Sequence, residues 1–507
     1  MNVDVTTVSE PELARGGDAA HGAAMTPEAK RARLAALLRQ IAAGGEPRVH
    51  APALSAVQKR LWFFDQLEPG TWFYNVPATL AFYGPLDVAA LERSLAEIVR
   101  RHETLRTTVV AGHDEPRPAI APAGSFRLPV IDLSSVPASR IDAEVARLTG
   151  EETLRPFDLA RGPLFRASLL RVSAERHVLF ATAHHIVCDG LSVKVLLGEL
   201  SALYAAFSQG RPSPLDELPS QYSDVVAREA EHLRSESVHA GLAYWSRTLA
   251  GAPPWIDLPA DRPRPTAQTF RGAREFGRIS AGATEGLRRL AKGSGATLFM
   301  TLLSAYYTLL FRYTDRTDIV VGSPVGGRGA VDSERMIGCF VNMLPLRCDL
   351  SGDPPFSELV RRVRDVALGA FRHETVPFDR LVEELKPARD AGRAPVFQVV
   401  LNMGSYSDVW SVPSPGLTVQ LLDLQHEPSM VDLTLYATEL ADGILLRTVY
   451  KADLFEAATI QQFLRRFETL VSAAIENPET RISALPLAAA DERSALAGAF
   501  SADLEDL

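Results

Sequence analysis

The sequence predicts a globular protein of mixed structure, α/β or α+β, that folds as two or three units. Its 507 residues are more than one hydrophobic core usually organises. Hydrophobic residues make up 46% of the chain and charged residues 23%, which is the composition of a soluble globular protein. From about residue 51 onward, strand-like and helical segments alternate, and this alternation indicates a mixed fold.

The N-terminal 50 residues have the composition of a linker. Residues 1–25 are polar, rich in glycine and alanine, and without periodicity. Thr26 is a suitable N-cap, Pro27 fits the first position of a helix, and the glycine pair at 44–45 would end that helix. We expect residues 1–50 to form a flexible linker or docking segment that carries one short helix.

The clearest elements lie in the middle of the first half. Residues 177–187, HVLFATAHHIV, are rich in strand-forming side chains and run directly into polar residues. Residues 191–207 repeat leucine and aromatic residues at helical spacing. The sequence therefore predicts a strand, a turn at about residues 184–190, and a helix.

Domain boundaries follow from changes in composition. A proline-rich stretch at 252–266 predicts an exposed segment without regular structure. We place the lobe boundary somewhat before it, with an N-terminal lobe at 51–220 and a C-terminal lobe at 221–490. Residues 491–507 end in the acidic run FSADLEDL and are expected to be a C-terminal linker.

Charge, cysteine content and hydropathy exclude several classes of protein. The net charge of −9 argues against a nucleic-acid partner, which would require a basic face. The three cysteines form no CxxC pair, so neither a disulfide framework nor a zinc site is indicated. The chain shows no signal-peptide pattern and no uninterrupted run of about 18 apolar residues. We expect a cytoplasmic protein with no metal and no membrane partner.

The most informative motif is HHIVCDG at 184–190. Adjacent residues of a strand point to opposite faces, so only one of His184 and His185 can face a given cleft. Asp189 can fold back in the turn and bond an arginine, and Gly190 leaves room for a tight turn or a substrate. Taken alone, a histidine pair is more often structural than catalytic. Zinc ligands at metal spacing and a GxSxG elbow are both missing from the sequence.

Six further motifs accompany HHIVCDG. In chain order, the seven motifs are SAVQKRLW (55–62), RHETLRT (101–107), HHIVCDG (184–190), YSD (222–224), IGCFVNMLPLR (337–347), HETVPFD (373–379) and RAPVFQV (393–399). In this order the set resembles the condensation-domain family of nonribosomal peptide synthetases. The fourth motif matches only in part, because two valines follow it where an aromatic residue is usual. The resemblance covers about residues 51–490.

The resemblance implies a fold and an activity. The fold is a V-shaped pseudo-dimer of two chloramphenicol-acetyltransferase-like lobes around a central tunnel. Donor and acceptor carrier proteins dock on opposite faces and send phosphopantetheine arms to an active site between the lobes. The reaction joins a carrier-bound thioester to an amine and forms an amide bond. No cofactor is bound covalently, the pseudo-dimer is expected to work as a monomer, and neighbouring synthetase domains are expected partners.

The resemblance also implies roles for the residues of the third motif. His185 is the expected catalytic base, and the Gly190 N–H, near a helix N-terminus, is a candidate donor to the oxyanion. His184 is expected to pack or to form structural hydrogen bonds. Asp189 is expected to shape the loop through an arginine, for which the candidates are Arg101, Arg106 and Arg271.

Other residues are assigned to the tunnel or to the core. Asn342, Cys188 and Ser192 are placed at the substrate tunnel, with a backbone-capping role as the alternative for Asn342. Cys188 is rejected as a nucleophile because the reaction requires no acyl-enzyme. The residues expected to serve structure are Trp62, Trp245, His102 and His373.

The motifs argue against some related functions of this family and leave others as alternatives. Leu191 stands where condensation domains often carry an aromatic residue, which leaves the subtype undetermined. Heterocyclisation domains have aspartates in place of the paired histidines, and degenerate recruiting domains lose the second histidine. An ester-forming chain-release enzyme and a non-catalytic recruiting module remain alternatives. The chain shows no adenylation motif and no carrier motif, so either an excised synthetase domain or a free-standing enzyme fits.

Overall fold

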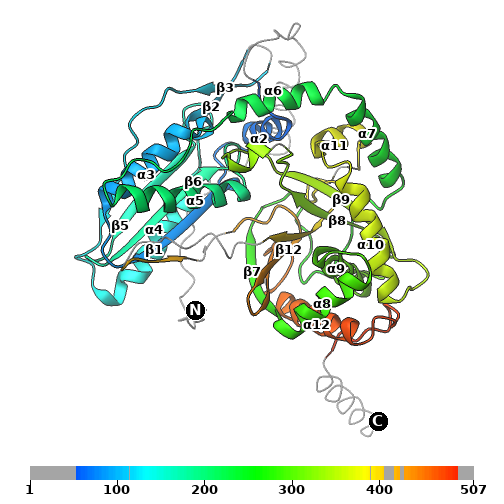
Figure 1. The fold of residues 1–507 in the computed structure, drawn as a ribbon. Helices are drawn as coiled ribbons and strands as arrows, with labels where there is room; N and C mark the ends of the chain where they lie inside the picture. Colours follow the sequence, from blue (N-terminus) through cyan, green and yellow to red (C-terminus); the bar gives the residue numbers. More distant parts are fainter. Residues whose placement is uncertain are drawn as a thin grey trace.

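The computed structural model describes residues 53–488, except 113–114, 330, 389, 405–415 and 423–426. Within these residues the chain forms two lobes that lie side by side and meet at one end, where α2, α6 and α11 gather (Figure 1). The predicted linkers at 1–50 and 491–507, and the short helix in the first of them, lie outside the described residues.

The first lobe is a five-stranded, mostly antiparallel sheet with helices on both faces. Its strands, in spatial order, are β11 (Thr418–Leu421), β1 (Asn75–Tyr83), β6 (Arg176–His184), β5 (Phe165–Arg171) and β4 (Val130–Asp132). Strands β2 (Thr107–Val110) and β3 (Arg117–Ile120) form a separate hairpin. The helices of this lobe are α2 (Ala56–Leu67), α3 (Val88–Arg101), η1 (Glu103–Arg106), α4 (Ala138–Leu154) and α5 (Gly190–Phe207).

The alternation of side chains along β6 builds two cores in the first lobe. Leu179, Ala181 and Ala183 belong to the larger core, to which α3 and α5 contribute. Val178 and Phe180 point to the other face, against α4. This is the two-residue period of a strand, and it explains why β6 is buried along nearly its whole length.

The second lobe is a six-stranded mixed sheet with a larger core. Its strands, in spatial order, are β7 (Gly272–Ser280), β13 (Gly443–Lys451), β12 (Leu433–Leu440), β10 (Val399–Gly404), β8 (Asp318–Val325) and β9 (Asn342–Asp349). The helices from Tyr222 onward are α6 (Tyr222–His232), α7 (Glu236–Leu249), α8 (Ala281–Gly293), α9 (Leu298–Thr314), η2 (Val331–Arg335), α10 (Phe356–Phe371), α11 (Phe378–Leu385) and α12 (Ala457–Glu476).

Two segments that follow residue 220 join the first lobe. Strand β11 pairs antiparallel with β1 at the edge of the first sheet, with Leu421 opposite Leu80. The loop between β8 and β9, residues 326–341, buries Ile337 and Cys339 in the core of the first lobe. Backbone that follows residue 220 is therefore built into the first lobe and ties the two lobes together.

Helix α5 is the most apolar helix of the first lobe. Among the described residues it is long and apolar enough to meet a length-and-composition test for a membrane span, and α8 and α9 meet it together but are bent by 104°. The buried side chains of α5 pack on α3 and on the sheet, which accounts for its composition. An apolar helix of this kind is what the core of a layered lobe requires.

Candidate active site

The HHIVCDG motif lies on the turn between β6 and α5, as the sequence predicts. β6 ends at His184, three residues earlier than the predicted strand, and α5 begins at Gly190. Asp189 is the N-cap of α5, because its Oδ1 accepts the N–H of Ser192 at 2.7 Å. The strand and the capped helix thus fix both ends of a five-residue turn that carries His185.

His184 lies buried at the end of β6 and hydrogen-bonds within the turn. Its Nδ1 accepts the N–H of Ile186 at 3.1 Å, and its ring lies edge-on to Phe157. Burial lowers the pKa of His184 to about 3, with His185 adding to the effect. The imidazole is therefore neutral, and its hydrogen bond holds the turn that follows the strand.

His185 is the partly exposed histidine of the pair. Its backbone N–H donates to the carbonyl of Tyr74 at 2.7 Å, which anchors the residue to the segment that precedes β1. Burial lowers the pKa of His185 below its usual value; Asp189 opposes this shift and Arg60 adds to it. The imidazole is neutral at pH 7 and can accept a proton there.

Asp189 forms the expected ion pair with an arginine, but the predicted partners are wrong. Its Oδ1 lies 2.9 Å from Nη2 of Arg328, and both side chains are almost fully buried. Arg328 comes from the β8–β9 loop, so this pair links the two lobes. The Arg328 guanidinium also lies over the ring of Phe340, 4.3 Å from its centroid.

The three arginines predicted for Asp189 have other partners. Arg101 is buried against Glu199, at 3.2 Å, and Arg271 pairs with Asp453 near the surface. Arg106 donates to backbone carbonyls, among them that of Val99 at 3.0 Å. Arg328 was missed because it lies in the segment VGGRG (325–329), which is outside the seven motifs.

Ser192 and Cys188 do not line a tunnel, contrary to the prediction. Ser192 is 0% exposed and Cys188 1% exposed. The Ser192 hydroxyl accepts the N–H of Gly338 at 3.0 Å and lies 2.7 Å from Asp189 Oδ1. Cys188 packs in the core of the first lobe, where burial raises the pKa of its thiol. Ser192 holds the turn against the β8–β9 loop, through Gly338 and Arg328.

Asn342 binds backbone groups, which is the alternative role given for it. Its Nδ2 donates to the carbonyls of Glu374 and Val376, each at 2.8 Å, and its Oδ1 accepts the N–H of Phe378 at 2.9 Å. The fifth motif thereby fixes the sixth motif at the start of α11.

A second inter-lobe ion pair lies close to His185. Both of its residues belong to the quoted motifs, but the sequence did not indicate that they pair. Arg60 of α2 lies 3.2 Å from Asp379 of α11. Burial raises the pKa of Asp379, and Arg60 opposes that shift. The Arg60 charge also acts on His185, Tyr74 and the thiol of Cys339. Because the two residues are 319 positions apart, only the tertiary fold brings them together.

The residues expected in the core are there. Trp62 and Trp245 are buried. His102 bonds Glu199 at 3.0 Å and accepts the N–H of Ile337 at 3.2 Å, and His373 stacks on Tyr244 at 4.0 Å. His102 is therefore a further anchor for the β8–β9 loop on the first lobe.

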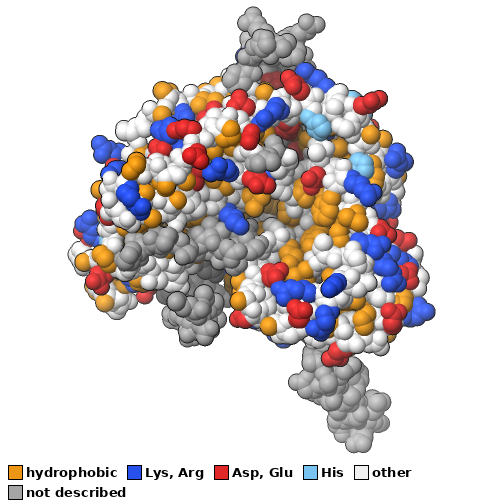
Figure 2. All heavy atoms as spheres, in the orientation of Figure 1, with side chains coloured by type: hydrophobic (Ala, Val, Ile, Leu, Met, Phe, Trp, Pro, Cys, Tyr) orange, Lys and Arg blue, Asp and Glu red, His pale blue; other side chains and the backbone are white. Residues whose placement is uncertain are grey.

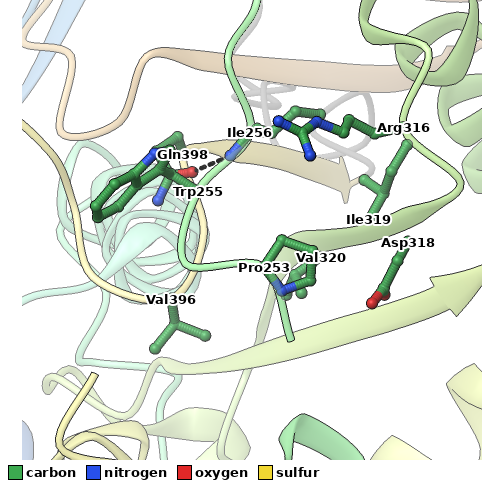
Figure 3. A pocket seen from close by; sticks show the side chains of 9 residues that line it. All are labelled: Pro253, Trp255, Ile256, Arg316, Asp318, Ile319, Val320, Val396 and Gln398. Atoms are coloured by element: carbon green, nitrogen blue, oxygen red, sulfur yellow. Dashed lines mark hydrogen bonds between the residues drawn. The ribbon is translucent and has the colours of Figure 1, made fainter. Parts of the chain in front are cut away.

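Other candidate sites are poorer. A small hollow in the second lobe is lined by Trp255, Arg316 and Val396, and beside it Gln398 accepts the N–H of Ile256 at 2.7 Å (Figure 3). That bond attaches the seventh motif to the irregular proline-rich segment, and the Asp318 carboxylate that also lines the hollow is paired with Arg347 at 2.7 Å. Within the described residues, no group of three or more His, Cys, Asp or Glu side chains is placed to hold a metal ion. On the face shown in Figure 2, hydrophobic side chains gather between the two lobes, below the end where the lobes meet.

Comparison with known proteins agrees with this geometry. Residues 50–497 match the Condensation domain family. The chain is 40% identical over 457 residues to one of the linear gramicidin synthase proteins of Brevibacillus parabrevis, covering 90% of this chain and 6% of that protein. It is 42% identical over 452 residues to chondramide synthase cmdD of Chondromyces crocatus, covering 89% of this chain and 12% of that protein.

A solved structure extends the likeness to three dimensions. The X-domain from teicoplanin biosynthesis superposes with a TM-score of 0.78 at 31% identity, covering 87% of this chain and 99% of that one. The two lobes are those of the chloramphenicol-acetyltransferase-like fold. The chain spans only a small part of the synthetases that it matches. The family match, the ordered motifs and the inter-lobe site together show that this chain belongs to the condensation-domain family of nonribosomal peptide synthetases.

Proposed function

We propose that this chain is an acyltransferase that joins an acyl group, held as a thioester on a carrier protein, to an amine and so forms an amide bond. The observation that carries the proposal is His185, a neutral and partly exposed imidazole where the two lobes meet. Its neutral state fits a general base, and its place between the lobes fits two substrates that arrive from opposite sides.

The proposed reaction needs one proton carrier. The amine nitrogen attacks the thioester carbonyl, His185 accepts a proton from that nitrogen, the C–S bond breaks, and the proton passes to the leaving thiolate. An α-amino group has a pKa of about 8, so part of it is neutral at pH 7. General base catalysis contributes about 10²- to 10⁴-fold, while an effective molarity of about 10⁵ M or more comes from positioning. Most of the rate therefore comes from holding two substrates together.

Gly190 is the proposed oxyanion donor. It is the first residue of α5 and is exposed, so its N–H stands at the positive end of the helix. Asp189 and Arg328 hold that helix end in place through the N-cap and the inter-lobe ion pair.

The proposed partners follow from the same reaction. We propose that donor and acceptor carrier proteins bring the substrates on phosphopantetheine arms, and that the chain has no cofactor of its own. Neighbouring synthetase domains, on the same polypeptide or another, would load those carriers. We place the protein in the cytoplasm as a monomer, because the two lobes already supply both sides of the site.

The test is intact-protein mass spectrometry of reactions with a panel of acyl-loaded carrier proteins and with amine and alcohol acceptors. Wild type, His185→Ala and His232→Ala would be compared; His232 is an exposed histidine at the end of α6. We expect condensed product from wild type and His232→Ala, and about 10²- to 10⁴-fold less from His185→Ala. Full turnover by His185→Ala would reject the base.

Two other outcomes would change the proposal. Product from alcohols but not from amines would make the chain an ester-forming enzyme. Carrier binding without product would make it a recruiting module, a role for which the 31% identity to the teicoplanin X-domain is the supporting observation, since that domain is known in complex with OxyB.

A further inference from the structure

A thiol from the second lobe touches the imidazole of His185. Sγ of Cys339 lies 3.5 Å from Nδ1 of His185, a hydrogen-bonding distance for sulfur. Cys339 is in the β8–β9 loop and His185 is on the turn of the first lobe, so the contact joins two segments that lie far apart in the sequence. The contact covers Nδ1 and leaves Nε2 as the ring nitrogen that can meet a substrate.

The position of the thiol is fixed on both sides. The Tyr222 hydroxyl donates to the carbonyl of Cys339 at 2.7 Å, and the N–H of Phe340 donates to Asp189 Oδ2 at 3.0 Å. The carbonyl of Gly338, on the other side, accepts the N–H of Asp189 at 3.0 Å. The residue that holds the catalytic turn thus also holds the backbone on either side of Cys339.

A cysteine beside a histidine can be a nucleophile, but this one is not set up for that role. The thiolate is the reactive form, and it needs access to a carbonyl. Cys339 is 1% exposed, and burial raises the pKa of its thiol well above the usual value. A buried protonated thiol can act as a weak hydrogen-bond partner for the ring.

We propose that Cys339 is a positioning residue, whose sulfur shares the Nδ1–H of His185 with that residue's own backbone carbonyl and so helps to keep the lone pair of the imidazole on Nε2, where the substrates meet. This inference rests on the proposed function of His185. In serine hydrolases a carboxylate holds the second ring nitrogen and also stabilises the imidazolium. A neutral sulfur fixes the tautomer but adds little to the stability of the imidazolium, which suits a base that must return its proton at once to the leaving thiolate.

The groups around His185 determine the direction of its pKa shift and therefore the pH dependence of the reaction. Burial and Arg60 lower the pKa of His185, whereas Asp189 and the residue's own carbonyl raise it. His184 is neutral on the neighbouring strand position, and the remaining titratable groups near the ring are Tyr74, Cys188, Cys339 and Asp379. The contribution of His185 to the rate should therefore rise with pH through a midpoint below 6.5, and deprotonation of an α-amine acceptor, with a pKa of about 8, should add a second rise at higher pH.

The test compares Cys339→Ala and Cys339→Ser with Cys348→Ala, which removes a buried thiol from the core of the second lobe. The readouts are kcat and KM as a function of pH, and the nitrogen chemical shifts of the His185 ring. We expect Cys339→Ala to lower kcat about 10- to 100-fold with KM nearly unchanged, and to mix the two tautomers. Cys339→Ser should keep the tautomer and kcat and move the acid midpoint upward, because a hydroxyl accepts better than a thiol. Cys348→Ala should leave tautomer and midpoint unchanged.

Three results would overturn the inference. One is a Cys339→Ala enzyme with the wild-type kcat, acid midpoint and tautomer. Another is equal effects of Cys339→Ala and Cys348→Ala, which would mean that any lost core thiol acts alike. The third is an acyl group attached to Cys339 in the wild type, which would make the residue a nucleophile. The ring shifts need no turnover, so they test the contact even if no acyl transfer is found.

Discussion

At the scale of single residues, two neighbouring histidines have opposite environments because of one change in backbone direction. His184 is the last residue of β6 and is buried beside Phe157. His185 leaves the strand, bonds the carbonyl of Tyr74, and keeps part of its ring exposed. The first histidine shapes the turn, and the second is available for chemistry.

The buried His184 predicts a loss of stability in acid. Its pKa is about 3 in the folded protein and near 6.5 when unfolded. Between these values unfolding takes up a proton, so folding stability should fall by about 1.4 kcal/mol per pH unit as the pH drops below 6.5, and this contribution should be constant above 6.5. Urea unfolding from pH 7 to 4.5 measures the slope.

The matched variants for this prediction are His184→Asn and His232→Asn. Asparagine can accept the N–H of Ile186 but does not titrate, so His184→Asn should reduce the slope. His232 is exposed on α6, and its replacement should leave the slope as it is. Equal slopes in wild type and His184→Asn would contradict the assignment.

At the scale of elements, the β8–β9 loop determines whether the site is assembled. Gly327 has a φ of +62°, and a Cβ placed there would lie 1.9 Å from the carbonyl oxygen of Phe340. The N–H of Phe340 bonds Asp189, so a shift of this residue disturbs the turn that carries His185. Glycine is required at this position both by backbone conformation and by space.

We therefore expect Gly327→Ala to destabilise the protein and to impair acyl transfer. The left-handed backbone alone costs an alanine about 1–2 kcal/mol, and the clash adds to that. Gly329→Ala is the control, because nothing lies within 4 Å of the position where its Cβ would be; its effect should stay within about 0.5 kcal/mol. Thermal melting and product formation measure both variants. Similar melting points for the two alanine variants would show that the loop tolerates the clash.

At the scale of the whole molecule, two hydrophobic cores are coupled by a few polar contacts between the lobes. The Asp189–Arg328 pair is the most buried of the inter-lobe ion pairs described. Each lobe has its own core, so loss of this pair should loosen the junction while the cores stay folded.

The corresponding prediction is made for Arg328→Met, with Arg271→Met as control. Removal of one partner of a buried ion pair costs about 3–5 kcal/mol, because the other charge stays buried. Hydrogen exchange measured by mass spectrometry should accelerate in residues 331–341 and at the start of α5, but not in β6 or α9. Arg271 pairs with Asp453 at the surface, and its loss should change little. Unchanged exchange of the β8–β9 loop in Arg328→Met would contradict this coupling.

The sequence by itself determined the mixed fold, the strand and helix around HHIVCDG, and the family. These depend on local periodicity, capping and ordered motifs, which are properties of contiguous residues. It did not determine which arginine meets Asp189, that Ser192 and Cys188 are buried, or that Cys339 reaches His185. Those contacts join residues from about 139 to 154 positions apart, across two lobes. These residues of the second half of the chain reach the first lobe on the β8–β9 loop, which packs into the core of that lobe, and no local pattern encodes this packing.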